Sequence, residues 1–439
     1  MDRAALEQRV GDLLAEAKRR GASAAEADVS TTNGLSVSVR MGEVETIEYN
    51  QDRGLGITVY FGQRKGSAST SDFSPQAIRE TVTAACGIAK YTAEDEYSGL
   101  ADPELMAYGY ADLDLYHPWS IDADQAIVLG QRCEAAARAV DPRITNSEGA
   151  SVSTHEGLRL YGNSHGFIGA YPSTRHGLSC SVIAQEGEAM QRDYWYSSSR
   201  LSGELESAER VGQQAAERAL RRLQGRQVAT GKMPVLFAAD VASGLLSHFL
   251  SAIRGESLYR RSTFLLDSLG TQVFPEFVRL TEQPHLKRAL GSAPFDGEGV
   301  RTSAKDIVSD GVVRSYILSS YSARKLGMRT TGNSGGIHNL LISSTGKSFD
   351  ELLATMGSGL LVTELMGQGV NQTTGDYSRG AAGFWVEGGV IQYPVEEITI
   401  AGNLREMYRG IRDIGNDVDL RRNVRTGSIL LDEMMVAGE

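Results

Sequence analysis

Residues 237–250, FAADVASGLLSHFL, connect a predicted strand to a predicted helix, an arrangement that often positions catalytic metal ligands. The apolar run that ends at Phe237 predicts the strand, and an amphipathic helix is expected to begin near Asp240. The segment supplies one early carboxylate, Asp240, and one histidine, His248. Three interpretations are open from these residues alone: an active site, the remnant of one, or a core helix.

The stretch GNSHG, residues 162–166, matches the G-x-S-x-G pattern of a nucleophilic serine. That motif requires a strand, a sharp turn and then a helix. Here LRLY precedes the motif and FIGAYPS follows it, so a strand leads into another strand. The sequence therefore predicts a turn at this position and no nucleophile.

Two further short motifs also lack the context that their chemistry needs. STGKS, residues 344–348, resembles the end of a phosphate-binding loop, but Leu341 occupies the position of the first glycine. We interpret Lys347 as a loop lysine and Ser348 as a helix cap. His155-Glu156 begins like a zinc-binding helix, but the next positions on that helix face hold Arg159 and Leu160. The remaining histidines show no ligand spacing, although they could converge in space: His117, His165, His176, His248, His285 and His338.

Two glycine-rich stretches, TTGNSGG at 330–336 and the segment 366–384, are the most unusual parts of the chain. Glycine permits unusual dihedral angles and close approach of another backbone. The stretches are either hairpin ends in a β domain or a cleft in which an extended peptide binds as an additional strand. In the second case, replacing Gly380 or Gly383 by valine is expected to block binding of the peptide without preventing folding of the chain. The candidate peptide-binding residues are Gly380, Gly383, Asp376, Tyr377 and Arg379.

Length and composition limit the possible classes of protein. A chain of 439 residues exceeds the size that one core usually supports, so at least two domains are expected. A formal charge of -11 argues against nucleic acid or an anionic membrane as a partner. We find neither an apolar signal core at the start nor an apolar run long enough to span a membrane. The three cysteines, Cys86, Cys133 and Cys180, suit a reducing cytoplasm better than a disulfide framework.

The first half of the sequence predicts an α/β domain with an antiparallel sheet. Apolar residues between Leu6 and Ala17 recur at helical spacing, and strict alternation then predicts a meander of short strands. The predicted strands are 35–41, 44–49, 55–61 and 66–70, followed by helices near 75–91 and 122–139, strands within 150–200, and a helix at 203–224. The polar segment 224–232 is the predicted boundary, which gives domains 1–225 and 231–439.

The second half is expected to be mostly β, because hairpin signals recur in it. Asp310-Gly311 and Gly388-Gly389 predict the turns of hairpins spanning 305–318 and 383–395. A single helix is expected to interrupt these strands, with Ser348 and Glu351 as its capping box. Together the two halves predict an α+β protein.

A series of segments in the same order resembles the PmbA/TldE branch of the TldD/PmbA family, formerly called "modulator of DNA gyrase". The segments are ITNSEG, YGNSHG, STRHGLSCSVIA, RRSTFLLDSLG, SSYSARKLG, GGIHN, VTELMGQGV, TGDYSRGAAGFWVE, QYPVEEITIAGNL and GSILL. The resemblance implies an N-terminal α/β domain and a β-rich, barrel-like C-terminal domain. It also implies a cytoplasmic TldD–TldE zinc metalloprotease that degrades or processes unfolded peptides, including peptide precursors and antitoxins.

The resemblance also implies that this chain is the non-catalytic subunit. TldD-like chains carry H-E-x-x-x-H at the positions that Ala239, Asp240 and Gly244 occupy here, and they supply a C-terminal cysteine ligand. This chain has neither histidine, and no cysteine follows Cys180. Asp240 suits a helix N-cap or a first-turn position instead. No metal is therefore expected in this chain, and zinc is expected in a TldD-like partner.

Two rival roles for the chain are compatible with its sequence. It could be an autonomous peptidase with a site assembled from distant residues, or a non-enzymatic modulator of DNA gyrase. A homodimer is possible when the chain is alone.

Overall fold

The N-terminal half of the chain is built on one long antiparallel sheet. The computed structural model describes residues 3–439. The six strands lie in the order β3-β2-β1-β4-β5-β6, with every neighbouring pair antiparallel. Their bounds are β1 Ala24–Arg40, β2 Glu43–Phe61, β3 Arg64–Thr70, β4 Ile144–Asn163, β5 Ile168–Glu186 and β6 Ala189–Ser199. The tight turn between β1 and β2 is made by Met41 and Gly42, both with positive φ.

Four helices cover one face of this sheet in two pairs. These helices are α1 Arg3–Arg19, α2 Pro75–Tyr91, α3 Ala123–Arg138 and α4 Ala208–Arg221. Along β1 the buried side chains all belong to one face: Ala25, Ala27, Val29, Leu35, Val37 and Val39. The first three pack with α1 and α2, and the last three pack with α3 and α4. The alternation in the sequence therefore creates two small cores on one continuous sheet.

The C-terminal half contains a closed β-barrel. Strand pairings run β7–β12–β13–β14–β17 and return from β17 to β7, which closes a ring of five strands. Closure removes the sheet edges at these strands. The strands are β7 Gly231–Phe237, β12 Gly359–Met366, β13 Asp376–Glu387, β14 Val390–Asn403 and β17 Ile429–Ala437, with β15 Ile411–Ile414 attached to β17.

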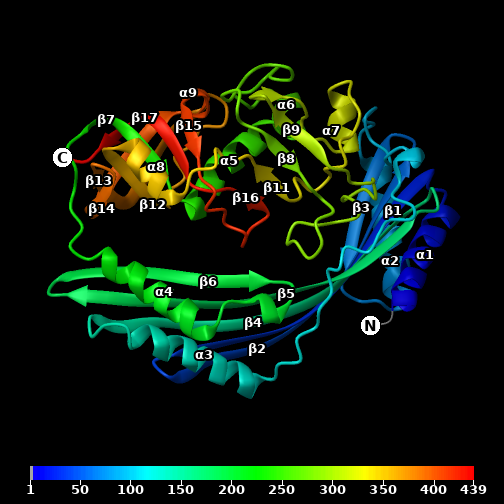
Figure 1. Cartoon of the computed structure of the whole chain (residues 1–439). Helices are drawn as coiled ribbons and strands as arrows, with labels where there is room; N and C mark the ends of the chain where they lie inside the picture. The colour runs from blue at the N-terminus through cyan, green and yellow to red at the C-terminus, as the bar shows by residue number, and fades with distance from the viewer. Residues whose placement is uncertain (1–2) are drawn as a thin grey trace.

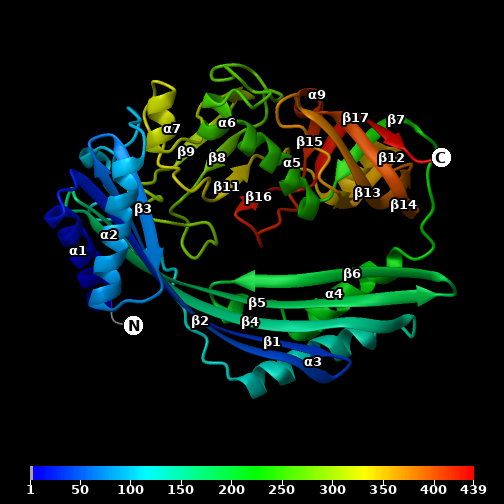
Figure 2. The same cartoon turned by 180° about the vertical axis from the view of Figure 1, so that it is seen from behind.

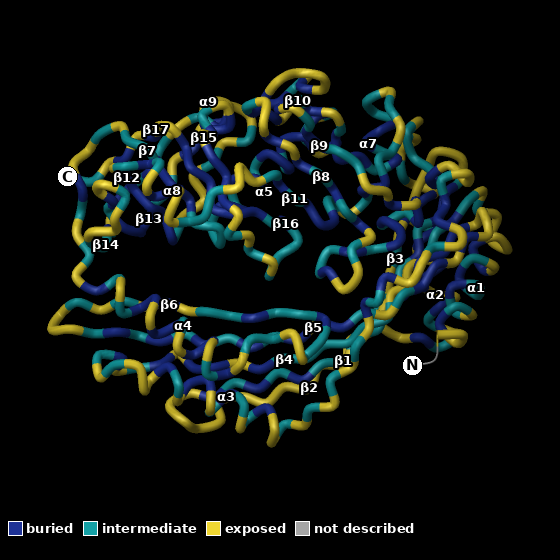
Figure 3. Tube along the Cα trace, viewed as in Figure 1, coloured by how far each residue is buried: buried dark blue, intermediate teal, exposed yellow. Residues whose placement is uncertain are grey.

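A second sheet lies beside the barrel and shares its core. Its strands, in the order β10-β9-β8-β11-β16, are β10 Val312–Val313, β9 Lys305–Ser309, β8 Leu280–Glu282, β11 Leu340–Ile342 and β16 Val424–Arg425. The helices of this half are α5 Ala239–Ala252, α6 Gly255–Tyr259, α7 Ser320–Lys325, α8 Phe349–Met356 and α9 Leu404–Arg409. Side chains from α5, the barrel and the second sheet form one continuous apolar cluster. Figure 3 shows buried segments gathered inside this half, whereas the strand turns of the N-terminal sheet are exposed.

The two halves meet along the edge strand β6 and at the curled end of the N-terminal sheet. Figures 1 and 2 show β6 running alongside the C-terminal half. At the curled end, the ring of Phe167 packs edge-on against Phe295 at 5.7 Å. The Arg200 guanidinium, which is buried, donates to the carbonyl oxygens of Ala289 and Leu290 at 3.1 and 2.8 Å. These contacts hold the halves in a defined relation, so residues from both can form one site.

The α+β class, the antiparallel N-terminal sheet and the barrel-like C-terminal half predicted from the sequence are confirmed. Both glycine hairpins are present, with Asp310, Gly311, Gly388 and Gly389 all at positive φ. The capping box of Ser348 and Glu351 is also confirmed, at the start of α8. The domain boundary at 225–231 stays a prediction.

Two expectations about the elements were wrong. Strands 44–49 and 55–61 are one continuous strand, β2, because residues 50–54 stay paired with β1. The second half contains several short helices besides α5 and α8, namely α6, α7 and α9. These helices have five or six residues each, too short for a 3.6-residue periodicity to be recognised. Within residues 3–439, no helix combines the length and the apolar character needed to cross a membrane.

Candidate functional site

Helix α5 begins at Ala239, in the segment where no metal ligand is expected from the sequence. Its N-cap is Ala238, whose side chain makes no capping hydrogen bond, and Ala239 is the first helical residue. Asp240 therefore occupies the first turn, where a carboxylate interacts favourably with the helix dipole. Of its two predicted roles, the first-turn position is correct and the N-cap is not. Gly244, one turn further along, faces open space, since a methyl group added there would touch nothing within 4 Å.

The Asp240 carboxylate is bound by Arg218 of helix α4, in the other half of the molecule. Arg218 Nη1 lies 3.0 Å from Asp240 Oδ2, and Arg218 Nε lies 3.0 Å from Asp193 Oδ1 on β6. The side chains of Arg218 and Asp193 are only 10% and 6% exposed, so solvent screens this network weakly. Burial opposes the charge of Arg218, but the two carboxylates raise its pKa above the ordinary value. One guanidinium thus joins α4, β6 and the first turn of α5.

The residues around α5 do not fit a metal ion. Ala239 and Gly244 have no donor atoms, and Asp240 is engaged by Arg218. His248 lies edge-on to the ring of Tyr377 at 6.0 Å. Burial, together with the charge of Arg379, lowers the pKa of His248. Within residues 3–439, no three histidine, cysteine or acidic side chains are grouped so that they could hold a metal ion. A positively charged environment of this kind also repels cations.

A cavity of about 280 Å³ opens beside α5, between β6 and the barrel. We call it the arginine cavity, because six arginines line it: Arg192, Arg218, Arg222, Arg379, Arg421 and Arg422. Three carboxylates also line it, those of Asp193, Asp240 and Glu364. The indole of Trp195 forms part of the wall, with the guanidinium carbons of Arg421 and Arg218 at 3.8 and 5.4 Å from the ring centroid. The cavity therefore combines a basic lining with an aromatic wall.

The five candidate peptide-binding residues do not converge on one place. Of these residues, Arg379 is the one that lines the arginine cavity. Asp376 accepts hydrogen bonds from Thr374 and Asn403 near the start of β13, and Tyr377 is buried against α5. Gly380 and Gly383 lie in the middle of β13, which is paired with β12 on one side and β14 on the other. The open strand edge that was expected at these two glycines is absent, because both sides of β13 are paired with neighbouring strands. Peptide contact by the five residues stays a prediction.

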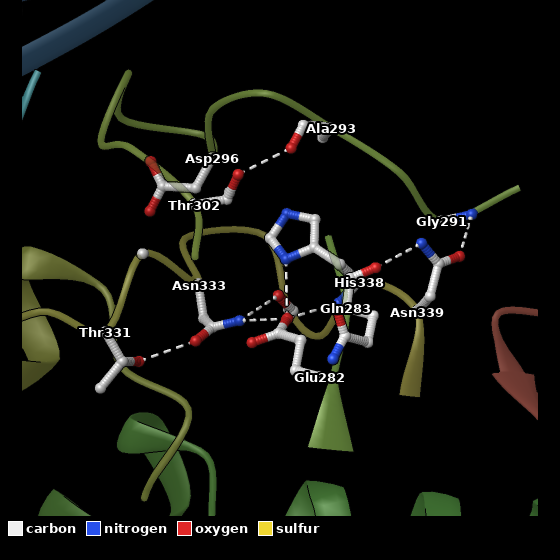
Figure 4. Close-up of polar contacts among 12 residues, drawn as sticks. Glu282, Gln283, Gly291, Ala293, Asp296, Thr302, Thr331, Asn333, His338 and Asn339 are labelled. Carbon is white, nitrogen blue, oxygen red and sulfur yellow. Dashed lines mark hydrogen bonds and ion pairs between the residues drawn. The ribbon is translucent and has the colours of Figure 1, made fainter. Parts of the chain in front are cut away.

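The other glycine-rich stretch adjoins a buried polar cluster that sequence reasoning missed (Figure 4). Glu282, which is fully buried, accepts hydrogen bonds through Oε1 from Asn333 Nδ2 at 2.8 Å and from His338 N at 2.8 Å. His338 Nδ1 lies 2.7 Å from the same oxygen, and Lys305 Nζ lies 2.9 Å from Oε2. Asn339 hydrogen-bonds nearby to Ser292 and to the carbonyl of Gln283. Lys305 balances the charge of Glu282, and Oε1 of Glu282 accepts the hydrogen bonds of Asn333 and His338, so this cluster stabilises the fold between β8, β9 and β11.

Glu282 is expected to give the protein an acid-sensitive component of stability. Burial opposes its charge, but the His338 hydrogen bond and the Lys305 charge hold its pKa below the ordinary value. A depressed carboxylate pKa adds stability above the unfolded-state value of about 4.3, and that stability is lost as the pH falls through the folded-state pKa. Glu282→Gln should therefore cost about 1–2 kcal/mol near neutral pH, and the difference from the wild type should narrow in acid. Urea unfolding across the pH range measures this difference in the free energy of unfolding.

Glu433→Gln is the matched control for this pH experiment. Glu433 pairs with Lys232 on the surface, where the two side chains are 54% and 63% exposed. Solvent screens such a pair, so its removal should change stability little at any pH. The role given to Glu282 would be contradicted if the difference in free energy of unfolding between the wild type and Glu282→Gln stayed constant from neutral to acid pH.

The arginine cavity had only a weak signal in the sequence. Arg218 near the end of α4 and Arg222 at its C-cap are four residues apart, a spacing that places both on one side of the helix. Arg379, Arg421 and Arg422 lie far away in the chain, and no spacing connects them to α4. The short motifs behave as predicted: GNSHG forms the turn between β4 and β5, and Lys347 pairs with Asp413 at 2.8 Å.

Comparison with known families gives matches along most of the chain. Residues 25–89, 116–223 and 230–438 match domain 1, the central domain and the C-terminal domain of the PmbA/TldA metallopeptidases. The chain is 55% identical to "Metalloprotease PmbA" of Escherichia coli O157:H7, over 97% of this chain and 94% of the relative. It is 51% identical to "Metalloprotease PmbA homolog" of Haemophilus influenzae, over 99% of this chain and 96% of the relative. "Metalloprotease TldD homolog" of the same species is 23% identical to this chain, over 86% of this chain and 82% of the relative.

Two solved structures share the whole architecture. A proposed modulator of DNA gyrase from Bacteroides thetaiotaomicron superposes with a TM-score of 0.94 at 30% identity, covering 99% of each chain. TldE from Thermococcus kodakarensis superposes with a TM-score of 0.85 at 21% identity, covering 98% of this chain and 100% of its own. At that identity the second match supports the fold alone.

Proposed function

The chain belongs to the PmbA/TldA metallopeptidase family, and from this membership we propose that it is the non-catalytic subunit of a TldD–TldE-type zinc metalloprotease. In this proposal a TldD-like partner holds the zinc and cleaves the peptide bond. The observation that carries the proposal is the start of α5. There, the side chains of Ala239 and Gly244 have no atom that could bind a metal ion, and Arg218 forms an ion pair with the Asp240 carboxylate. An arginine at this position disfavours a metal ion both by its charge and by its use of the carboxylate.

The occurrence of two different homologues in one species supports a two-chain enzyme. Haemophilus influenzae has a PmbA homologue that is 51% identical to this chain and a TldD homologue that is 23% identical. Both align with most of this chain, so the two relatives are expected to share its fold. A complex of two similarly folded chains can form a pseudo-symmetric dimer with one catalytic half.

In this complex the chain would contribute to binding unfolded peptides in the cytoplasm. Gly380, Gly383, Asp376, Tyr377 and Arg379 were the sequence-based candidates for that contact. Arg379 is the member of this set that reaches the arginine cavity, and it is therefore the one we retain. Main-chain addition to β13 is not part of the proposal, since both sides of that strand are already paired.

The proposal is tested with the full chain, the TldD-like protein of the same cell, and their mixture. We expect less than a stoichiometric amount of zinc in this chain after dialysis, as measured by elemental analysis. We expect a 1:1 complex by size-exclusion chromatography with light scattering. Hydrolysis of unrelated unfolded peptides should be undetectable for this chain and highest for the complex.

Three outcomes would contradict the proposal. The first is one tightly held zinc per chain together with peptidase activity in the isolated protein. The second is a TldD-like chain that is equally active alone, which would make this subunit unnecessary. The third is the absence of a mixed complex, with this chain forming a homodimer alone.

A further inference from the structure

The arginine cavity has more positive charge than its own carboxylates neutralise. Asp193 pairs with Arg218 and with Arg222 Nη1, the second at 3.4 Å. Asp240 pairs with Arg218, and Glu364 pairs with Arg222. All three carboxylates of the lining are thus used by two of the six arginines.

Two more arginines of the cavity have partners outside it. Arg421 forms a two-point ion pair with Asp419, with Nε–Oδ1 at 2.8 Å and Nη2–Oδ2 at 3.0 Å. Arg192 lies 3.3 Å from Glu148 on β4. These pairs are complete, so neither arginine needs a ligand for charge balance.

Arg379 and Arg422 are the arginines of the cavity that pair with no carboxylate among residues 3–439. Arg422 donates from Nε to the Tyr196 hydroxyl at 3.2 Å and from Nη1 to Ser243 Oγ at 3.4 Å. Arg379 makes a long contact from Nε to the carbonyl of Met366 at 3.4 Å and also contacts the side chain of Tyr377, where its charge partly opposes the rise that burial causes in the pKa of Tyr377. Both side chains are partly buried, so their charges are incompletely solvated. Arg379 also lies close enough to His248 that its charge, after burial, contributes to lowering the pKa of that histidine.

We propose that the arginine cavity binds a carboxylate group through Arg379 and Arg422, and that the C-terminus of a peptide supplies it. Guanidinium groups bind carboxylates with two parallel hydrogen bonds, and a partly enclosed cavity strengthens them. The exposed ring of Tyr194 and the half-buried ring of Tyr196 stack at 6.4 Å and offer an apolar surface to the residue before the carboxylate. That a peptide is the source of the carboxylate rests on the proposed function; the anion site itself does not.

The experiment measures binding to the full chain by isothermal titration calorimetry. The probes are an unstructured N-acetylated peptide with a free C-terminal carboxylate, the same peptide with a C-terminal amide, and inorganic phosphate. We expect the free acid to bind roughly tenfold or more tightly than the amide. Arg379→Gln and Arg422→Gln should each weaken binding of the acid by roughly tenfold or more and leave the weak binding of the amide unchanged.

Arg412→Gln is the matched control, because Arg412 is exposed on β15 and does not line the cavity. It should bind the acid like the wild type. The contacts of Arg379 are on β12 and β13, whereas Arg422 contacts β6 and α5, so Arg379→Gln tests the site even where Arg422→Gln impairs folding. Thermal unfolding of each variant verifies the fold.

Equal affinity for the acid and the amide would overturn the proposal, as would binding of phosphate without binding of the acid. Wild-type affinity in both cavity variants would overturn it as well. Hydrolysis is not measured in this experiment. A negative result here therefore leaves the two-chain protease proposal intact, and failure of that proposal would not prevent carboxylate binding by this chain.

Discussion

Replacing Arg218 by methionine is expected to lower the free energy of unfolding by about 3 kcal/mol. The change removes the shared partner of Asp193 and Asp240, whose side chains are 6% and 19% exposed. A buried carboxylate without its cation is costly, and breaking a buried pair from one side typically costs about 3–5 kcal/mol. The lower end of that range applies because Arg222 still pairs with Asp193. Urea unfolding of the isolated chain near neutral pH measures the loss.

Arg210→Met on the same helix is the control for Arg218→Met. Arg210 is 54% exposed, and its nearest carboxylate, that of Glu217, is 4.0 Å away. Its loss should change stability by less than about 0.5 kcal/mol. Adding Asp193→Asn and Asp240→Asn to Arg218→Met should recover part of the lost stability, because no unpaired charge is then left buried. A loss below about 1 kcal/mol for Arg218→Met would show that the ion pairs contribute little.

Replacing Gly383 by alanine is expected to destabilise the barrel by more than about 3 kcal/mol. A methyl group at this position would lie 1.8 Å from the carbonyl oxygen of Leu361 on β12. A backbone atom cannot rotate away as a side chain does, so β12 and β13 must separate and lose hydrogen bonds. The variant should unfold at much lower urea concentration or accumulate as insoluble protein. Valine, being larger, should have a greater effect.

Gly380→Ala is the matched comparison on the same strand. There the added methyl group would lie 3.4 Å from Met366 Cβ, an ordinary van der Waals distance. We expect a change of less than about 1 kcal/mol. From the sequence, the two glycines were equivalent, and valine at either position was expected to leave the chain folded. Equal stability of the two alanine variants would contradict the strand packing described for Gly383.

The sequence determined the local features of this protein because each of them depends on residues close together in the chain. Alternation of apolar residues predicted the second half of β1, both ends of β2, and β3. Paired turn residues predicted the hairpins at Asp310-Gly311 and Gly388-Gly389. The Ser348 and Glu351 spacing predicted the start of α8. The residue types at 239, 240 and 244 were likewise sufficient to predict that α5 carries no histidine pair.

Tertiary structure decided what those local elements do together. The partner of Asp240 is on α4, on the far side of the segment that joins the two halves, and no periodicity encodes that contact. Likewise, the separation of 56 residues between Glu282 and His338 hid a buried pair from sequence inspection. Pairing of β13 with both β12 and β14 removed the strand edge expected at Gly380. Periodicity and turn chemistry specify which face of an element is apolar, whereas contacts between distant elements depend on how those faces pack. The arginine cavity is formed by such packing, because its basic residues come from four separate parts of the chain.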